Sequence, residues 1–307
     1  MITKSELDNA YRFCQQLAQS HYENFPVASL LLPKRLRKPI SVIYAFARTA
    51  DDFADEGSES ESTRLEQLEQ YSTALKQISA DNYQGNAPIF IALQDVIQQH
   101  QLPIGLFDDL LSAFKQDVVK SRYANFDEVL DYCRFSANPV GRLLLYLNGS
   151  PSQQQLQQSD AICSALQLIN FYQDIVQDYT EQDRIYIPQN ELAATGLKAS
   201  DLIQPDSEKI APLIRSLYQR TADMMQAGYP LGASLTGRLG WEIRAMTLGG
   251  IQTLALLRQQ SDRSLLTRPR LKKTTLFGIM LRSARKGQYM NRCQQLLLPE
   301  DKKTSPG

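Results

Sequence analysis

The first set of residues whose spacing suggests chemistry lies between residues 44 and 56. On a helix, side chains four positions apart share a face, so Asp51 and Asp55 point the same way. Arg48 and Tyr44 lie on the preceding turns of that face, and Asp52 lies beside it. The remaining residues of the segment are mostly apolar. This pattern predicts an acidic stripe on a helix that packs inside the protein.

A second acidic stripe follows more than a hundred residues later. Asn170, Asp174 and Asp178 are spaced at i, i+4 and i+8, and Gln167 lies about one turn earlier. The rest of this helix is also largely apolar. A polar stripe on an apolar helix needs partners inside the protein.

Carboxylates repeated at this spacing repel one another, and burial increases the penalty. Mg²⁺ is a suitable compensating cation, because it prefers oxygen ligands and often bridges carboxylates to substrate phosphates. A single motif of this kind is often a solvated acidic patch, whereas two motifs on apolar helices favour metal binding. The sequence therefore predicts two stripes that hold a diphosphate through Mg²⁺. The expected metal ligands are Asp51, Asp55, Asn170, Asp174 and Asp178.

Helical periodicity dominates the elements that must position these stripes. The first helix is expected to start near Ser5, with Asp8 completing a capping box. A break is expected at Asn138-Pro139, because proline disrupts a helix interior. The pattern predicts one all-α domain over residues 1–307, of about ten helices around a core or cavity. The other helices are expected near residues 39–56, 63–79, 87–100, 105–119, 126–148, 153–179, 207–228, 234–259 and 274–294.

Composition excludes several other classes of protein. Lys+Arg and Asp+Glu both total 33, so no basic excess indicates nucleic-acid binding. The four cysteines are far apart and are expected to be buried free thiols, not zinc ligands or disulfides. No signal-peptide core or membrane-spanning run is apparent, so a cytoplasmic protein is expected. The two histidines have no convincing nucleophile partner, and there is no GxGxxG or Walker-type loop.

The motifs, taken together, resemble those of the squalene/phytoene synthase family. The likeness rests on Arg48 with the first acidic motif, on the spacing from Gln167 to Asp178, on residues 132–141 and on residues 184–188. It covers about residues 20–285, and the motifs occur in the family's order. The resemblance implies a single-domain, all-α isoprenoid synthase fold around a central cavity. It also implies an enzyme that acts on prenyl diphosphates with Mg²⁺.

Details of the sequence resemble one branch of that family, the bacterial hopanoid-cluster enzymes called HpnC. These details are residues 21–29, 136–141 and 170–174. The implied reaction converts presqualene diphosphate to hydroxysqualene, with release of diphosphate and without NADPH. Gln173 stands where phytoene and dehydrosqualene synthases usually carry arginine, which puts condensation of two farnesyl diphosphates in doubt. Functional coupling to a presqualene diphosphate synthase is therefore expected.

The resemblance also implies roles for individual residues. Gln173 is a candidate to hold the water that forms hydroxysqualene, since an amide both donates and accepts hydrogen bonds. Tyr44, Phe135, Phe171 and Tyr172 are candidates for stabilising a carbocation, with ordinary core packing as the alternative. The expected catalytic residues are Asp51, Asp52, Asp55, Asp174, Asp178, Tyr172 and Gln173. The expected substrate-binding residues are Tyr44, Arg48, Tyr132, Gln167, Asn170, Arg184 and Tyr186.

A basic amphipathic segment covers residues 263–292, which contain nine Lys/Arg and no Asp/Glu. Such a segment is typical of peripheral contact with an anionic membrane, here the inner membrane surface. It is also consistent with a solvated helix or with diphosphate contacts. Two alternatives to the hydroxysqualene reaction remain. One is a full head-to-head synthase that joins two farnesyl or two geranylgeranyl diphosphates and so forms presqualene diphosphate, squalene or phytoene. The other is a non-catalytic lipid-binding or assembly factor.

Overall fold

The computed structural model describes residues 2–20, 32–203 and 207–298. The described residues are almost entirely helical and form no strand, with one isolated parallel bridge between Arg122 and Ile185. The all-α prediction is confirmed. The chain divides into two compact units. The first unit comprises residues 1–120 and 134–152, and the second comprises residues 121–133 and 153–307.

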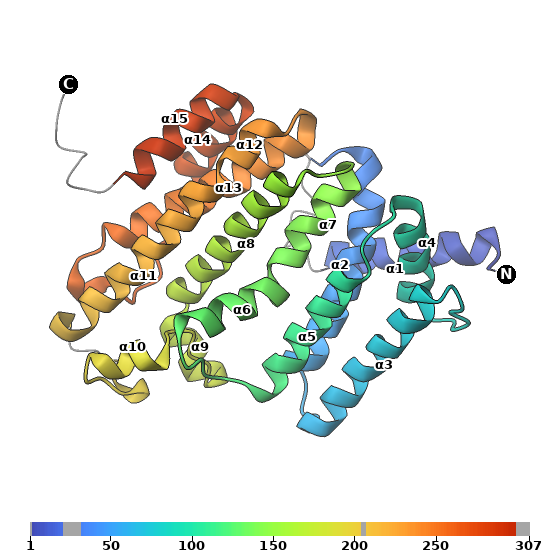
Figure 1. The fold of residues 1–307 in the computed structure, drawn as a ribbon, viewed down its shortest axis with the longest axis horizontal. Helices are drawn as coiled ribbons and strands as arrows, with labels where there is room; N and C mark the ends of the chain where they lie inside the picture. The colour runs from blue at the N-terminus through green and yellow to red at the C-terminus, as the bar shows by residue number, and fades with distance from the viewer. Residues whose placement is uncertain (1, 21–31, 204–206, 299–307) are drawn as a thin grey trace. The chain divides into compact units, whose positions relative to one another are not determined.

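The first unit is built around helix α2 (Lys34–Asp55), which carries the first acidic motif (Figure 1). It packs against α1 (Lys4–Ser20), α3 (Glu61–Ser79), α4 (Pro88–His100), α5 (Gly105–Val119) and α7 (Asn138–Asn148). Its buried ring Phe46 lies edge-on to Phe107, with centroids 5.4 Å apart, and contacts Tyr71 and Phe90. This aromatic core holds α2 by one face and leaves the opposite face for the acidic motif.

The capping residues of α1 lie two positions before the predicted pair. Thr3 and Glu6 cap the helix, not Ser5 and Asp8. The Glu6 amide donates to Thr3 Oγ1 at 3.2 Å, and the Thr3 amide donates to the Glu6 carboxylate at 2.7 Å. These reciprocal bonds satisfy helix-terminal amides. Both candidate pairs have suitable residues three positions apart, so spacing alone did not distinguish them.

The break predicted at Asn138-Pro139 is confirmed. Helix α6 (Phe126–Ser136) ends one residue before Ala137, and α7 begins at Asn138. Proline occupies the first turn of α7, where it costs no intrahelical hydrogen bond. The break lets α7 supply three wall residues to the cavity described below.

The second unit is built on α8 (Gln153–Gln173), which runs alongside α11 (Ser207–Gly228) and α13 (Gly237–Arg258) (Figure 1). A Cβ on Gly228 would lie 2.8 Å from the Gln158 carbonyl oxygen, so glycine permits the close approach of α11 to α8. Helices α14 (Lys273–Ala284) and α15 (Lys286–Leu297) cover α13. The short helices α9 (Ile175–Gln182), α10 (Gln189–Ala194) and α12 (Pro230–Ser234) complete the unit, together with two 3₁₀ turns (Ala199–Leu202 and Asp262–Ser264).

Two helices expected to be continuous are broken. The stretch predicted as 153–179 divides at Asp174, whose backbone leaves the helical region at φ −111° and ψ 14°. The stretch predicted as 274–294 divides at Arg285, which has an extended backbone. No proline or glycine lies beside Asp174, so local sequence gave no signal for the first break, whereas Gly287 follows the second break by two residues.

Three further predictions concern the cysteines, membrane-spanning helices and the number of domains. The four cysteines are free, as predicted, and three of them are buried, whereas Cys163 is half-buried. Burial raises the pKa of the Cys133 thiol to about 12. Along the described chain, no helix combines the length and the apolar character needed to cross a bilayer. The organisation as a single domain stays a prediction.

Candidate active site

The first acidic motif occupies the last turns of α2, with Arg48 among its carboxylates. Arg48 Nη1 lies 3.3 Å from Asp51 Oδ2, and Nη2 lies 2.6 Å from Asp52 Oδ1 and also contacts Glu56. Burial lowers the pKa of Arg48, but the three carboxylates outweigh that effect and raise it. Asp55 is the final residue of the helix and is exposed. Arg48 therefore joins Asp51 and Asp52 at this end of α2, and the role of these residues in the site stays a prediction.

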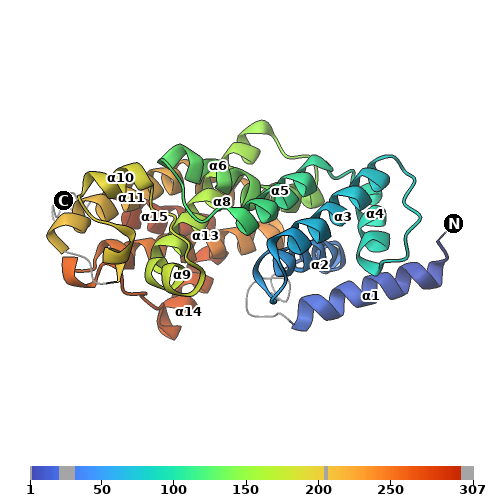
Figure 2. The same cartoon turned by 90° about the horizontal axis from the view of Figure 1, so that it is seen from below.

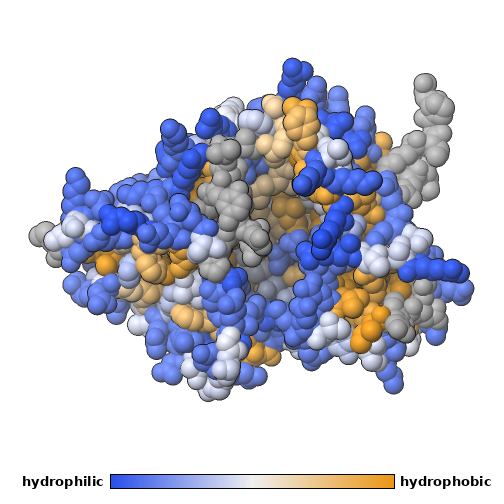
Figure 3. All heavy atoms as spheres, turned by 180° about the vertical axis from the view of Figure 1, so that it is seen from behind, coloured by the Kyte–Doolittle hydropathy of each residue, from blue (hydrophilic) through white to orange (hydrophobic). Residues whose placement is uncertain are grey.

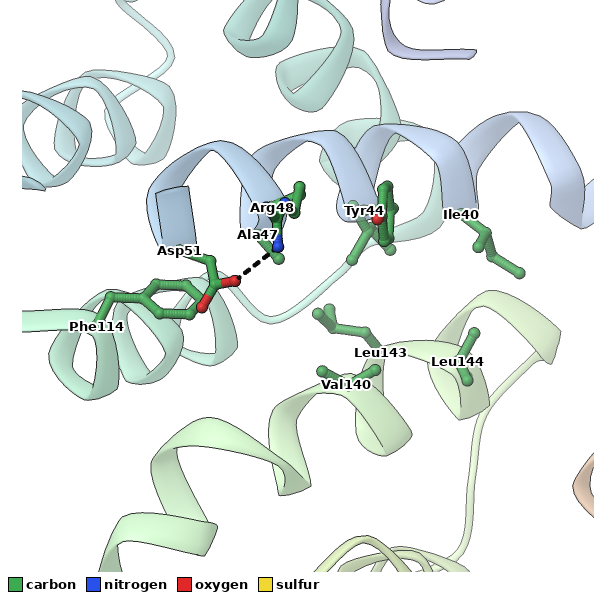
Figure 4. Close-up of a pocket in the computed structure, with 10 residues that line it drawn as sticks. Ile40, Tyr44, Ala47, Arg48, Asp51, Phe114, Val140, Leu143 and Leu144 are labelled. Atoms are coloured by element: carbon green, nitrogen blue, oxygen red, sulfur yellow. Dashed lines mark hydrogen bonds and ion pairs between the residues drawn. The ribbon is translucent and has the colours of Figure 1, made fainter. Parts of the chain in front are cut away.

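Beside this motif lies a cavity of about 250 Å³ that is lined by α2, α5 and α7 (Figure 4). Its polar end carries Arg48 and Asp51, and Tyr44 lies one turn before Arg48 on α2. The rest of the wall is aliphatic and aromatic. It is formed by Ile40, Ile43, Ala47, Phe114, Val140, Leu143 and Leu144. An apolar cavity with charged groups at one end suits a ligand that has a hydrocarbon body and an ionic head.

The second acidic motif spans the junction of α8 and α9. Although the helix is broken at Asp174, the Asp174 amide still donates to the Asn170 carbonyl at 3.1 Å. The Asp178 amide likewise donates to the Asp174 carbonyl at 2.7 Å. The backbone therefore keeps the four-residue spacing across the break. Gln167 is half-buried on the preceding turn of α8, and Asn170 is exposed.

Electrostatics make this second motif unfavourable without a cation. Burial, followed by the charge of Asp174, raises the pKa of Asp178 to about 7. Burial also raises the pKa of Asp174, against the opposing effect of Arg268. Asp174 Oδ1 is buried without a hydrogen-bond partner, since its 3.1 Å ion pair with Arg268 Nε lacks hydrogen-bond alignment. Two carboxylates of this kind have the chemistry of a site for a hard divalent cation.

Arg268 is a candidate site residue that the sequence did not single out. It lies after the 3₁₀ turn at Asp262–Ser264 and reaches Asp174, and the next residue, Pro269, accepts a hydrogen bond from Gln173 Nε2 at 3.3 Å. The pairing spans 94 positions of sequence, so no spacing rule could have found it. It brings a cation to the second motif from the basic segment.

Four aromatic rings of the second unit form a cluster close in sequence to this motif. Phe171 and Tyr186 are stacked, with centroids 3.5 Å apart and planes 3° from parallel. Tyr132 lies 6.1 Å from Phe171, and Tyr123 lies 5.5 Å from Tyr186. The sequence predicted Tyr132 and Tyr186 as substrate-binding residues and Phe171 as a candidate to stabilise a carbocation, and it did not single out Tyr123. The stack fixes the segment after α9 against α8.

That segment also brings a second cation to the motif. The Arg184 amide donates to the Asp178 carbonyl at 3.0 Å, and the charge of Arg184 lowers the pKa of Asp178. Its guanidinium donates to Gln182 at 3.2 Å. The Ile185 amide donates to the Ser121 carbonyl at 3.0 Å, which ties the segment down. Arg184 and Arg268 therefore both lie at the second motif.

The remaining aromatic candidates lie in different surroundings. Tyr172 is 1% exposed, with its ring 5.8 Å from Tyr218 in the core between α8 and α11. Burial strongly raises the pKa of its hydroxyl, so Tyr172 stays neutral. This position corresponds to the core-packing alternative. Phe135 is half-buried in the first unit, beneath the Arg134 guanidinium at 3.8 Å.

The metal-ligand set stays a prediction. Within the described ranges, no three or more His, Cys, Asp or Glu side chains are grouped so as to hold a metal. The two acidic motifs belong to different compact units. Residues 21–29, which contribute to the resemblance, lie outside the described residues.

Comparison with known proteins identifies the family. The model of the squalene/phytoene synthase family matches residues 18–276, which is most of the chain. The chain belongs to the squalene/phytoene synthase family, and the enzyme class predicted from the motifs is confirmed.

Individual relatives indicate which branch of the family the chain resembles. A hydroxysqualene synthase from Rhodopseudomonas palustris is 40% identical over 223 residues, which cover 72% of this chain and 74% of the relative. One from Sinorhizobium fredii is 32% identical over 245 residues, covering 79% and 82% of the two chains. The crystal structure of squalene synthase HpnC from Alicyclobacillus acidocaldarius superposes with a TM-score of 0.76 at 34% identity, covering 84% of this chain and 96% of that one. The likeness to the HpnC branch and the isoprenoid synthase fold are confirmed.

Proposed function

We propose that this enzyme converts presqualene diphosphate to hydroxysqualene and releases diphosphate. The observation that carries the proposal is the cavity of the first unit, with charged groups at one end and an apolar wall. Presqualene diphosphate has the matching form, because it joins a long hydrocarbon to an anionic head. The relatives named hydroxysqualene synthases support this reaction within the family.

The acidic residues fit Mg²⁺ as the cofactor. Asp51 and Asp55 in the first motif, with Asn170, Asp174 and Asp178 in the second, supply the oxygen ligands that Mg²⁺ prefers. The raised pKa of Asp178 and the buried oxygen of Asp174 support this assignment, since a cation would relieve both. When bound, the metal neutralises charge on the leaving diphosphate.

Basic side chains complete the proposed recognition of the diphosphate. Arg48 is already held at the polar end of the cavity by Asp51 and Asp52, so its guanidinium is oriented before substrate binds. Arg184 and Arg268 lie at the second motif and can donate charge-assisted hydrogen bonds to phosphate oxygens. Arg268 would exchange its carboxylate partner for the substrate when it does so.

The proposed reaction also needs a dry surface for the carbocation and one water to quench it. The aliphatic wall of the cavity excludes water from the hydrocarbon. The ring faces of Phe171, Tyr186 and Tyr132 carry negative partial charge and can stabilise a nearby cation. Gln173 donates its Nε2 proton to Pro269, so its amide oxygen is the acceptor proposed to hold the water.

Product analysis tests the reaction. The enzyme is supplied with Mg²⁺ and either presqualene diphosphate or farnesyl diphosphate, with and without NADPH, and the lipids are extracted. We expect hydroxysqualene from presqualene diphosphate without NADPH and no product from farnesyl diphosphate alone. Adding a presqualene diphosphate synthase should then restore hydroxysqualene from farnesyl diphosphate, which tests the proposed coupling.

A second candidate function is a full head-to-head synthase. It is favoured by a phytoene synthase from Mycobacterium tuberculosis that is 29% identical over 259 residues. Presqualene diphosphate, squalene or phytoene formed from farnesyl or geranylgeranyl diphosphate alone would establish this candidate and exclude the first. Failure to turn over any of these substrates, despite folded protein, would indicate a non-catalytic lipid-binding or assembly factor.

A further inference from the structure

Helix α14 presents large apolar side chains to solvent. Phe277 is 67% exposed, Leu281 is 56% exposed and Leu276 is 47% exposed. Phe277 and Leu281 are four residues apart and therefore lie on one face of the helix. The helix lies at the outer edge of the second unit in Figure 2, and Figure 3 shows that hydrophobic residues, in orange, reach the surface among hydrophilic ones. A cluster of this kind usually marks a binding surface.

The exposure is a consequence of how the opposite face is fixed. Trp241 Nε1 donates to Ser283 Oγ at 2.9 Å, and Arg244 Nε donates to the Ser283 carbonyl at 2.5 Å. Ser283 and Ile279 are buried against α13. Since these contacts set the rotation of α14 about its own axis, Phe277 is directed outward by the packing of the helix.

Basic residues surround the apolar face. Lys272 and Lys273 begin α14, and Arg282, Arg285 and Lys286 lie at its end, all of them exposed. No acidic residue occurs between residues 263 and 292. Lysines in the first turn of a helix are opposed by the helix dipole, so they do not serve the stability of α14. Their position is explained by an anionic partner outside the chain.

We propose that α14 docks the enzyme on an anionic lipid bilayer. Phe277 and Leu281 enter the interfacial region, and the flanking lysines and arginines contact phosphate headgroups. A second copy of this chain is a poor partner for the same face, because a two-fold contact would oppose two basic surfaces. The inference is independent of the reaction proposed above, because it rests on the surface of α14 alone.

Vesicle co-sedimentation of the full chain tests this docking. Vesicles of phosphatidylcholine with about one third phosphatidylglycerol are compared with pure phosphatidylcholine vesicles. We expect binding to the anionic vesicles, little binding to the neutral ones, and weaker binding as salt rises from about 0.1 M to about 1 M. Equal binding to both kinds of vesicle, or binding to neither, would overturn the proposal.

Two variants connect the binding to α14. Phe277→Ser/Leu281→Ser should weaken partitioning at least roughly tenfold, since two large apolar side chains no longer enter the bilayer. Lys272→Gln/Lys273→Gln should weaken it roughly 25-fold on anionic vesicles only, at about fivefold for each charge.

The controls are matched for exposure and charge. Val119→Ser/Ile203→Ser removes two apolar residues outside α14 that are 62% and 53% exposed, and Lys4→Gln/Lys34→Gln removes two charges of the first unit. Both controls should bind vesicles as the unmodified enzyme does. Sedimentation velocity is run on every variant. If Phe277→Ser/Leu281→Ser turned a dimer into a monomer and left vesicle binding unchanged, α14 would be a protein interface and the proposal would be wrong.

Discussion

The apolar cavity of the first unit allows a direct test of where the hydrocarbon of the substrate binds. Ala47 lies on α2, lines the cavity and comes directly before Arg48 at its polar end (Figure 4). Replacing Ala47 with leucine adds three carbons to the wall. The cavity measures about 250 Å³, so the larger side chain has space to enter without displacing its neighbours.

The expected loss of affinity follows from the surface that leucine would occupy. If three added carbons exclude two to three carbons of bound substrate, the loss is about 0.8 kcal/mol for each, or about 2 kcal/mol in all. That corresponds to a roughly 30-fold increase in KM, provided that KM reflects binding. The free energy of unfolding should stay the same or rise slightly, because the new carbons are buried in existing space.

Steady-state kinetics with presqualene diphosphate and thermal unfolding together decide the outcome. Ala80→Leu, at the exposed end of α3, makes the same chemical change away from the cavity and should alter neither quantity. An unchanged KM in folded Ala47→Leu would refute the placement of the hydrocarbon in this cavity. A lower unfolding temperature in Ala47→Leu would instead show that the cavity lacks the space assigned to it.

Three further predictions concern the second unit. Asp174→Asn should lower kcat by at least about a hundredfold without unfolding the protein, because it removes a ligand charge needed at the departing diphosphate; near-normal turnover in Mg²⁺ would contradict the two-motif site. Folding raises the pKa of Asp178 from 3.8 to about 7. The contribution of Asp178 to the free energy of unfolding is therefore fully present below pH 3.8 and is lost as the pH rises through about 7. We therefore expect that, in EDTA, the unfolding temperature of Asp178→Asn minus that of the unmodified protein increases as the pH rises from about 5 to about 8. A difference that stays constant over this range would contradict the raised pKa. Tyr289→Phe removes a buried hydroxyl that donates to the Tyr229 carbonyl at 2.8 Å, and unfolding in urea should show a loss of about 1–3 kcal/mol with kcat unchanged. A loss no larger than that of Tyr146→Phe, on α7 of the first unit, would show that the hydrogen bond to Tyr229 is not needed.

Much of the candidate site was predictable because it is local in sequence. Residues four apart on one helix must share a face, so Arg48, Asp51 and Asp52 could be grouped without knowing what α2 packs against. The break before Asn138 is also local, since Pro139 has no amide proton to continue the hydrogen bonding of α6 and is tolerated in the first turn of a new helix. The all-α fold followed from helical periodicity along the whole chain.

The sequence by itself therefore determined the spacing of the acidic residues and most of the helices, because both depend on short-range geometry, and its motifs indicated the family. Tertiary packing alone decided which distant groups meet. It brought Arg268 to Asp174, stacked Tyr186 on Phe171 and placed the Tyr172 ring in the core. It also selected the exposed face of α14: periodicity marks a helix as amphipathic, but only the contacts with Trp241 and Arg244 fix which side of it meets solvent.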